Sequence, residues 1–305
     1  MKVKPLNLGC AYGVQFSPDG TRLAVLGRDL ILWDVAARRK LWRCKPIPHC
    51  SAMAFSPDGS ALAVKSTSGL LAVVDAATGD VILNFRNNKD GEGSGPAWSP
   101  CGRYLADGGW NGRLQVREAA TGDVLFAQEY PREMLRAVCS LAGGRLLVLH
   151  GVKSVAEGAL QPPDYVTVWD WPLQAGASRT ALSLPGLSSI AASPDGQLLA
   201  ALHRAGGVEQ LSVFALADGK PLATVAVAQG GGTGNTLCWS PDGGTVARIG
   251  KGRLEFYGWP ALGLQHELAF TYPCALAFLP DTPLVAIGSW EKGALMEWNL
   301  NKERP

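Results

Sequence analysis

The chain has 305 residues and a formal net charge of +2, from 28 basic and 26 acidic residues. Hydrophobic residues make up 47% and charged residues 18%, which is typical of a globular protein and excludes an extended disordered chain. The balanced charge gives no reason to expect a nucleic-acid or anionic-membrane partner, and no stretch reaches the about 18 apolar residues of a membrane-spanning helix.

The first predicted strands follow one another with short breaks. GVQF (13–16) alternates and ends at the turn SPDG, TRLAVLG (21–27) is rich in β-formers, LILWD (30–34) follows, and AARR turns into KLWRC (40–44). The same order recurs as SAMAF–SPDG–SALAVKS–TSG–LLAVVD–AATG–DVILNF (51–85) and as GPAW–SPCG–RYLADGG–WNG–RLQVRE–AATG–DVLFAQ (95–128). Each unit therefore predicts four short antiparallel strands, named a to d, with tight turns between them.

The turn between strands a and b recurs as a pentapeptide. It reads FSPDG (16–20), FSPDG (55–59), WSPCG (98–102), ASPDG (192–196) and WSPDG (239–243), with degraded copies at CSLAGG (139–144) and FLPDT (278–282). Successive copies are 39, 43, 41, 53, 47 and 39 residues apart, about 44 on average. A period of about 40–45 residues is that of four-stranded propeller blades, so the seven copies predict seven blades.

The residue types of this turn indicate structural chemistry rather than catalysis. Pro sets φ at the first central position, the Asp side chain can bond nearby backbone, and Gly accepts a positive φ. The aromatic residue before the turn is expected to point into the core, at Phe16, Phe55, Trp98, Trp239 and Phe278.

The two ends of the chain together make up one further period. After EWNL (297–300) only NKERP remains, which is too short for a fourth strand, and KVKPLNL (residues 2–8) can supply it. We therefore expect residues 1–305 to form a single domain, an all-β, seven-bladed propeller of four-stranded antiparallel blades. The N-terminal strand would complete the last blade, which leaves no open sheet edge.

Trp-Asp pairs stand at the end of strand c in LWD (32–34) and VWD (168–170), and EWN (297–299) keeps the Trp. With the spacing and the SPDG turns, this pattern resembles the WD-repeat propeller family, as a divergent member of bacterial type. The family's Gly-His dipeptide is missing before every strand a, and no complete His–Ser–Asp–Trp tetrad is found in any blade. The resemblance implies that partners dock on the face formed by the b–c and d–a loops.

Catalytic and metal chemistry is not indicated. The four histidines (His49, His150, His203 and His266) fall in different blades without ligand spacing, and GxSxG is absent, so we expect no catalytic residue, no metal and no cofactor. The seven cysteines lack CxxC spacing and are interpreted as reduced, apolar core residues. The N-terminus lacks the apolar segment of a signal peptide, and the expected localisation is cytoplasmic.

Two polar loops have some features of ligand sites. QGGGTGN (229–235) has no Lys in the position of a phosphate loop and no helix pattern after it, which favours a plain loop. NNKDGEG (87–93) places Asn88, Asp90 and Glu92 in alternation, as at the start of a calcium loop, but residue 99, at position twelve, is Ser. A weak calcium site and a mobile d–a loop both remain open for this segment.

Candidate partner-binding residues lie in the predicted b–c loops. Trp110 and Trp290 are at loop tips, with Arg28, His203, Arg204 and Lys292 in other tips or beside them. Trp and Arg are frequent anchors of protein interfaces, although each ring could instead fold back on its own blade. The insertion GVKSVAEGALQPPD (151–164) lengthens the fourth b–c loop, either as an interaction loop or as neutral extra length.

These features predict a non-catalytic, monomeric interaction module that binds a protein or peptide of unknown identity. The alternative is a small-ligand-binding or enzymatic propeller that uses the mouth of the central channel. Against it, the strand-a residues two positions before each turn are mostly small and apolar: Gln15, Ala54, Ala97, Val138, Ala191, Cys238 and Ala277. A carbohydrate-binding propeller would require aromatic pockets in equivalent loops, and Trp residues occupy two of the seven tips.

Overall fold

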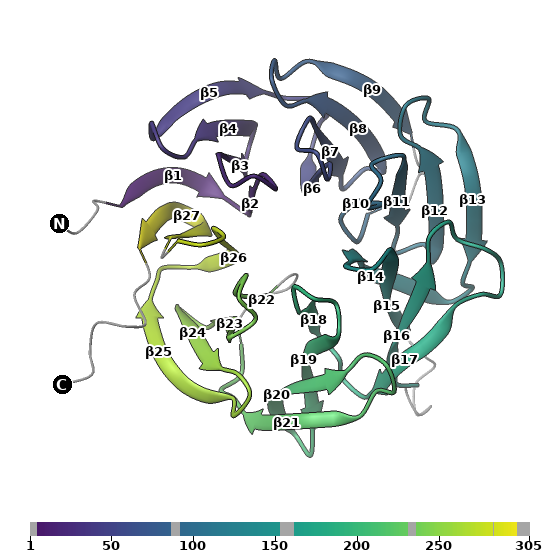
Figure 1. Cartoon of the computed structure of the whole chain (residues 1–305), viewed down its shortest axis with the longest axis vertical. Helices are drawn as coiled ribbons and strands as arrows, with labels where there is room; N and C mark the ends of the chain where they lie inside the picture. The colour runs from purple at the N-terminus through teal and green to yellow at the C-terminus, as the bar shows by residue number, and fades with distance from the viewer. Residues whose placement is uncertain (1–4, 87–91, 153–161, 231–235, 283, 298–305) are drawn as a thin grey trace. The chain divides into compact units, whose positions relative to one another are not determined.

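The computed structural model describes residues 5–86, 92–152, 162–230, 236–282 and 284–297, which form strands β1 to β27 and, within these ranges, no helix (Figure 1). The strands assemble into seven antiparallel sheets, which we number one to seven in chain order. Six of the sheets consist of four consecutive strands in the order of the chain. This is the arrangement that the repeated turn predicts.

The first three sheets come from residues 13–129. Sheet one contains β2 (Gly13–Phe16), β3 (Arg22–Leu26), β4 (Leu30–Asp34) and β5 (Arg39–Cys44). Sheet two contains β6 (Cys50–Phe55), β7 (Ala61–Ser66), β8 (Leu70–Asp75) and β9 (Val81–Arg86). Sheet three contains β10 (Ala97–Trp98), β11 (Tyr104–Gly108), β12 (Arg113–Glu118) and β13 (Val124–Glu129).

The next three sheets follow the same plan. Sheet four contains β14 (Glu133–Leu141), β15 (Arg145–Val152), β16 (Asp164–Asp170) and β17 (Arg179–Leu184). Sheet five contains β18 (Ser189–Ala192), β19 (Leu198–Ala205), β20 (Val208–Ala215) and β21 (Pro221–Ala226). Sheet six contains β22 (Leu237–Trp239), β23 (Thr245–Gly250), β24 (Arg253–Gly258) and β25 (Gly263–Ala269).

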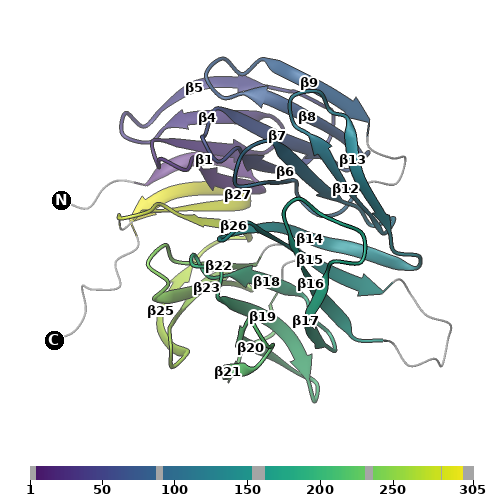
Figure 2. The ribbon, with the colours of Figure 1, turned by 45° about the vertical axis from the view of Figure 1, so that its right-hand side comes forward.

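Sheet seven joins the two ends of the chain. It has the order β1 (Leu6–Ala11), β27 (Leu284–Glu297), β26 (Pro273–Phe278), and Figures 1 and 2 both show β27 between the other two. The first half of β27 pairs with β26. Strand β1 pairs with β27 from Leu6 opposite Leu295 to Ala11 opposite Ser289. The long strand thus supplies both strand b and strand c, and the N-terminal strand completes the sheet as expected, over Leu6–Ala11. Residues 2–4 of the predicted strand lie outside the described residues.

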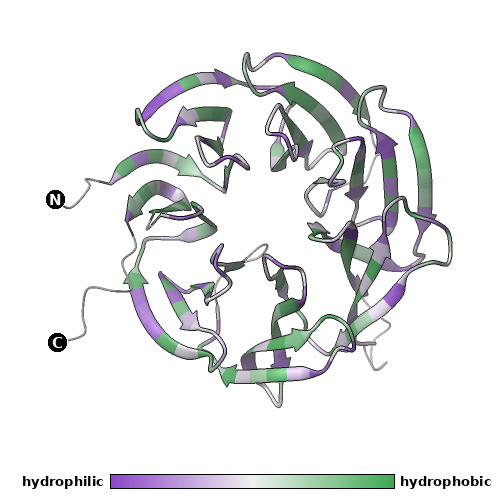
Figure 3. Cartoon of the chain, in the orientation of Figure 1, coloured by the Kyte–Doolittle hydropathy of each residue, from purple (hydrophilic) through white to green (hydrophobic). Residues whose placement is uncertain are grey.

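The strands divide between two compact units. The first unit consists of Met1–Leu41 with Ser188–Pro305, and the second consists of Trp42–Leu187. Within each unit, strands b and c are buried on both faces, as in β11 and β23, because they lie between the sheets before and after their own. Figure 3 shows the resulting hydrophobic stretch along β8, whereas the outer strand β25 is mostly hydrophilic and exposed.

The aromatic residue before each turn lies in the core, which confirms the sequence prediction. Phe16, Phe55, Trp98, Trp239 and Phe278 are each 6–8% exposed. The indole N–H of Trp98 donates to the Ala54 carbonyl at 3.0 Å, and that of Trp239 donates to the Ala191 carbonyl at 3.0 Å. Each Trp therefore ties its strand a to strand a of the sheet before it.

The SPDG turns form a uniform hydrogen-bonded unit. The serine hydroxyl donates to the aspartate Oδ1 at 2.5–2.6 Å in the pairs Ser17–Asp19, Ser56–Asp58, Ser193–Asp195 and Ser240–Asp242. This hydrogen bond is the largest cause that lowers the pKa of each of these aspartates. The turn glycines have φ between +68° and +72°, a region that favours glycine (Gly20, Gly59, Gly102, Gly196 and Gly243).

The prediction that the cysteines are core residues is wrong for Cys10 and Cys101, and Cys44, Cys139, Cys238 and Cys274 are half-buried. All seven are free thiols, but only Cys50 is buried, and Cys10 and Cys101 are exposed. Cys101 occupies the aspartate position of the WSPCG turn, where the side chain must face solvent to reach the turn backbone. In the part of the chain that the structure describes, no helix is long and apolar enough to cross a bilayer.

Candidate functional site

An exposed tryptophan marks the end of the hairpin within β27. The side chain of Trp290 is 62% exposed. The Ser289 hydroxyl donates to the Thr271 carbonyl at 2.8 Å and accepts the backbone N–H groups of Glu291 and Lys292 at 3.1 and 3.3 Å. These bonds hold the short turn in one conformation and present the Trp290 ring to solvent.

Tyr12 supports this ring from the opposite end of the sequence. It lies between β1 and β2, in a d–a loop, and its ring stacks on Trp290 with centroids 5.5 Å apart and an interplanar angle of 29°. The Tyr12 hydroxyl donates to the carbonyl of Gly27, the residue before Arg28. The structure therefore brings the predicted residues Arg28, Trp290 and Lys292 to one place through a tyrosine that sequence reasoning missed.

Tyr272 is a second missed aromatic residue, at the d–a loop before β26. It is 63% exposed, and its carbonyl accepts the backbone N–H of Trp290 at 3.3 Å. Its φ of +46° is in the left-handed region, which is unfavourable for a residue with a Cβ. We call the group of Tyr12, Tyr272 and Trp290 the aromatic patch; all three belong to the first unit.

His203 is not at a loop tip, and that prediction is wrong. Strands β19 and β20 continue to Ala205 and Val208, so the hairpin end consists of Gly206 and Gly207. The His203 ring is 7% exposed, and its Nε2 is 2.9 Å from the Ser212 hydroxyl. A buried ring cannot contact a partner. The neighbouring Arg204 points the other way, as expected for consecutive strand residues, and is exposed.

Trp110 lies in the second unit, between β11 and β12, and is 44% exposed. Its backbone N–H donates to the Glu92 carbonyl at 2.6 Å. Its ring rests on Gly93, where an added Cβ would lie 2.9 Å from the Trp110 Cδ1 atom. Gly93 also has a φ of +144°, so a side chain there would meet both steric and backbone strain. Trp110 is thus partly folded onto its own d–a loop.

A buried hydrogen-bond network occupies sheet four. The Trp169 indole N–H donates to the Thr167 hydroxyl at 3.2 Å, and this hydroxyl is 2.9 Å from His150 Nε2. His150 Nδ1 is 2.9 Å from a Glu133 carboxylate oxygen, which also accepts the Tyr165 hydroxyl at 2.8 Å. With Thr167 donating to Nε2, the Nδ1–H donates to Glu133. Both ring nitrogens are therefore engaged.

This network indicates a structural role. The His150 ring is 0% exposed and stacks on Tyr165 with centroids 4.3 Å apart. Burial lowers the pKa of His150 below its ordinary value of 6.5, opposed by the Glu133 carboxylate, so the ring is neutral at neutral pH. No complete His–Ser–Asp–Trp tetrad was expected from the sequence, and the network found here uses Thr and Glu instead of Ser and Asp.

Buried charges in other sheets are paired as well. In the second unit, Lys65 Nζ lies 2.7 Å from Asp107 and donates to the Gly108 carbonyl at 2.6 Å. In the first unit, Arg248 contacts Glu209 at 2.6 Å and Glu255 at 2.5 Å. Burial raises the pKa of Asp107, and the Lys65 ammonium opposes that shift. In each pair the opposite charge compensates the buried one, so these side chains are engaged with one another.

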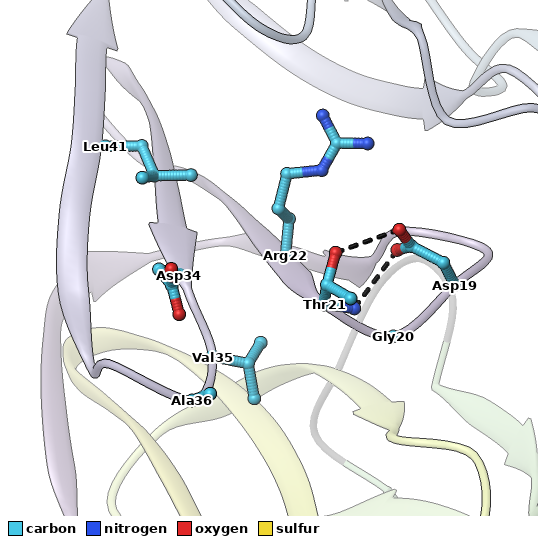
Figure 4. Close-up of a pocket in the computed structure, with 8 residues that line it drawn as sticks. All are labelled: Asp19, Gly20, Thr21, Arg22, Asp34, Val35, Ala36 and Leu41. Atoms are coloured by element: carbon cyan, nitrogen blue, oxygen red, sulfur yellow. Dashed lines mark hydrogen bonds between the residues drawn. The ribbon is translucent and has the colours of Figure 1, made fainter.

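A shallow depression opens beside the first a–b turn, in the first unit (Figure 4). It is lined by Asp19, Gly20, Thr21, Arg22, Asp34, Val35, Ala36 and Leu41. The carboxylate of Asp19 accepts the Ser17 and Thr21 hydroxyls, and that of Asp34 accepts the backbone N–H of Ala37. In sheet two the equivalent Asp58 and Asp75 make the same kinds of bond. The hydrogen bonds of its two aspartates are therefore a repeated feature of the sheet ends and do not mark a specific ligand site.

Three predicted ligand or interaction segments fall wholly or partly outside the described residues. These are residues 87–91 of the calcium-like loop, 153–161 of the insertion and 231–235 of the glycine-rich loop. Among the residues that the structure does describe, no group of three or more His, Cys, Asp or Glu side chains could hold a metal ion.

Seven sheets of four antiparallel strands place the chain among the seven-bladed β-propellers. No family model matches it, and no curated protein matches it in sequence. Among solved structures, hydrazine synthase of Kuenenia stuttgartiensis is similar at a TM-score of 0.77 and 14% identity, over 99% of this chain and 98% of that one. At this identity the likeness shows the fold alone, which is the fold that the turn spacing predicts.

Proposed function

We propose that this propeller is a non-catalytic, monomeric, cytoplasmic interaction module that binds a protein or peptide with its b–c and d–a loops. The observation that carries the proposal is Trp290, a large ring 62% exposed and held on Tyr12 at the end of a fixed turn. Interface hot spots are enriched in Trp, Tyr and Arg, and a pre-ordered ring loses little conformational entropy when a partner covers it.

Two further observations support a binding role over catalysis. The buried titratable side chains described above are engaged with one another, as Lys65 is with Asp107 and His150 is with Glu133. The strand-a residues Ala97 and Val138 are small or apolar and buried, which is unfavourable for a polar site along those strands. We also propose membership of the WD-repeat family, as a divergent bacterial-type member. The strand-c tryptophans Trp33 and Trp169, 7% and 2% exposed, support it.

The test is a pull-down from extract of the source cells, with mass spectrometry of the retained proteins. We expect a specific partner that is retained by the wild-type chain and lost with Trp110→Ala combined with Trp290→Ala, while the melting temperature stays nearly unchanged. Each single variant then shows which unit carries the contact. Retention of the same partner by the double variant, or unfolding of that variant, would contradict the proposal.

A further inference from the structure

An exposed cation lies at or next to each hairpin end between strands b and c in the first unit. Sheets one, five, six and seven contribute Arg28, Arg204, Lys251 and Lys292 respectively. Within the described residues, none of these four side chains makes an ion pair, whereas Arg248 and Arg253 of the same unit are both paired with Glu255. These four cations are therefore available to a partner at this end of the sheets.

The second unit lacks this feature in the part that the structure describes. Its hairpin ends consist of residues 67–69, which are Thr-Ser-Gly, and residues 109–112, which are Gly-Trp-Asn-Gly. The chain as a whole has a net charge of only +2, so a general excess of basic residues does not explain the cations of the first unit. Of the acids at these ends, Glu291 is exposed, and Asp29 is half-buried and engaged.

The aromatic patch lies among these cations. Trp290 is separated from Lys292 by one residue and stacks on Tyr12, whose hydroxyl binds the carbonyl of the residue before Arg28. An apolar surface of stacked rings, flanked by charges of one sign, selects a ligand that has an apolar side chain and charges of the opposite sign.

We propose that the b–c and d–a loops of the first unit bind an acidic, extended segment of a partner protein. An apolar side chain of the segment packs on the stacked rings of Trp290 and Tyr12, and its Asp and Glu residues lie against Arg28 and Lys292. Lys251 of sheet six and Arg204 of sheet five extend the cationic surface beyond sheet seven. This inference rests on the proposed function and names the chemical class of its partner.

The experiment is a selection of random twelve-residue peptides on the immobilised chain, followed by anisotropy titration of the enriched peptides after labelling. We expect enriched peptides to be net negative with at least one aromatic or large aliphatic residue. Their affinity should fall as salt rises from 50 to 300 mM, because exposed charges attract across solvent. Arg28→Glu combined with Lys292→Glu should weaken binding at least about tenfold, because each substitution reverses the sign of a facing charge.

Two further variants test the position of the charges and the aromatic contact separately. Lys220→Glu changes an exposed lysine in the turn between β20 and β21, at the other end of the sheet, and should leave affinity unchanged. Tyr272→Gly removes an exposed ring where the backbone already has a φ of +46°, so it should fold normally and bind more weakly.

The outcomes distinguish the two proposals. Enrichment of neutral or basic peptides whose binding is lost in Trp290→Ala would overturn the acidic-segment inference. The proposed function would still hold. Binding that survives Trp290→Ala and Tyr272→Gly, or the failure of any peptide to be enriched, would overturn the inference. Loss of the pull-down partner in the Trp110→Ala, Trp290→Ala variant would then still support a partner of another class. Binding to phosphatidylserine vesicles without peptide binding would also overturn the acidic-segment inference.

Discussion

Trp290 stacks on Tyr12 with ring centroids 5.5 Å apart, although the two residues lie near opposite ends of the chain. The contact depends on sheet seven, where β1 pairs with the second half of β27. Joining the termini in one sheet therefore also assembles the aromatic patch. The same pairing brings Tyr12 within hydrogen-bond reach of the Gly27 carbonyl and so connects sheets seven and one.

Trp290 and Trp239 provide a matched pair of tryptophans in the first unit. We expect Trp239→Ala to lower the free energy of unfolding by about 3–5 kcal/mol, because its ring is 6% exposed and its indole donates to the Ala191 carbonyl. Trp290→Ala should lower it by less than about 1 kcal/mol, since its ring is mostly exposed. Urea unfolding followed by circular dichroism measures both. Equal losses would show that Trp290 is a core residue and would remove the basis of the proposed binding site.

The WSPCG turn offers a stabilising substitution. Ser99 Oγ lies 3.3 Å from Cys101 Sγ, whereas the serine hydroxyl binds the aspartate at 2.5–2.6 Å in the four SPDG turns. Cys101→Asp should add this charge-assisted bond and one to the backbone, and raise the free energy of unfolding by about 0.5–1 kcal/mol. The reverse change, Asp58→Cys in sheet two, should destabilise by a similar amount. A lower melting temperature for Cys101→Asp would contradict the interpretation of this turn.

His150 gives a pH dependence with a defined sign. Burial lowers its pKa in the folded state below the ordinary 6.5, so the unfolded chain takes up the proton first as the pH falls. The stabilisation that comes from keeping the His150 ring neutral is fully present above about pH 6.5, the ordinary pKa of His. It is lost as the pH falls towards the lower pKa of the folded state. Between pH 7.5 and 5, the free energy of unfolding of His150→Gln should therefore change less steeply than that of the wild-type chain.

The exposed His49 supplies the control for this experiment, because it lies outside the buried network. His49→Gln should leave the pH dependence as it is in the wild-type chain. If the free energy of unfolding of His150→Gln varied with pH as steeply as that of the wild-type chain, the His150 ring would not become harder to protonate on folding.

The buried Lys65–Asp107 pair predicts strong coupling between two substitutions. Both side chains are nearly inaccessible, at 0% and 3% exposure, so Asp107→Leu leaves an unpaired buried ammonium and should cost about 3–5 kcal/mol. Lys65→Met should cost a similar amount, and the double variant should recover most of the loss because no charge remains uncompensated. A double-mutant cycle in urea measures the coupling. Additive losses would show that the pair contributes no specific interaction.

Local chemistry explains why much of the fold could be predicted. The Ser-Pro-Asp-Gly turn depends only on residues within five positions of one another, so it can be recognised from the sequence alone. The spacing of its copies then predicts the sheets. Strand pairing in sheet seven was predictable because the seventh copy of the repeat needs a fourth strand, which β1 supplies. The burial of Phe16 and Trp239 before their turns follows from the same repeat.

The site could be predicted only in part. Trp290, Arg28 and Lys292 were candidates from the sequence because hairpin ends can be located from the repeat. Tyr12 and Tyr272 were missed because only the tertiary structure places them beside Trp290. His203 was misplaced because strands β19 and β20 extend further than the other b and c strands, and no turn signal marks where they stop.

The sequence alone thus determined the elements, their order and the number of sheets, since these depend on contacts between near neighbours in the chain. Only the tertiary structure decided which loop residues meet and which polar side chains are buried. Lys65 and Asp107 have charged side chains typical of solvent-facing positions, and it is the packing of one sheet against the next that encloses them and pairs their charges. Contacts of that kind depend on register and stacking, which the one-dimensional pattern does not record.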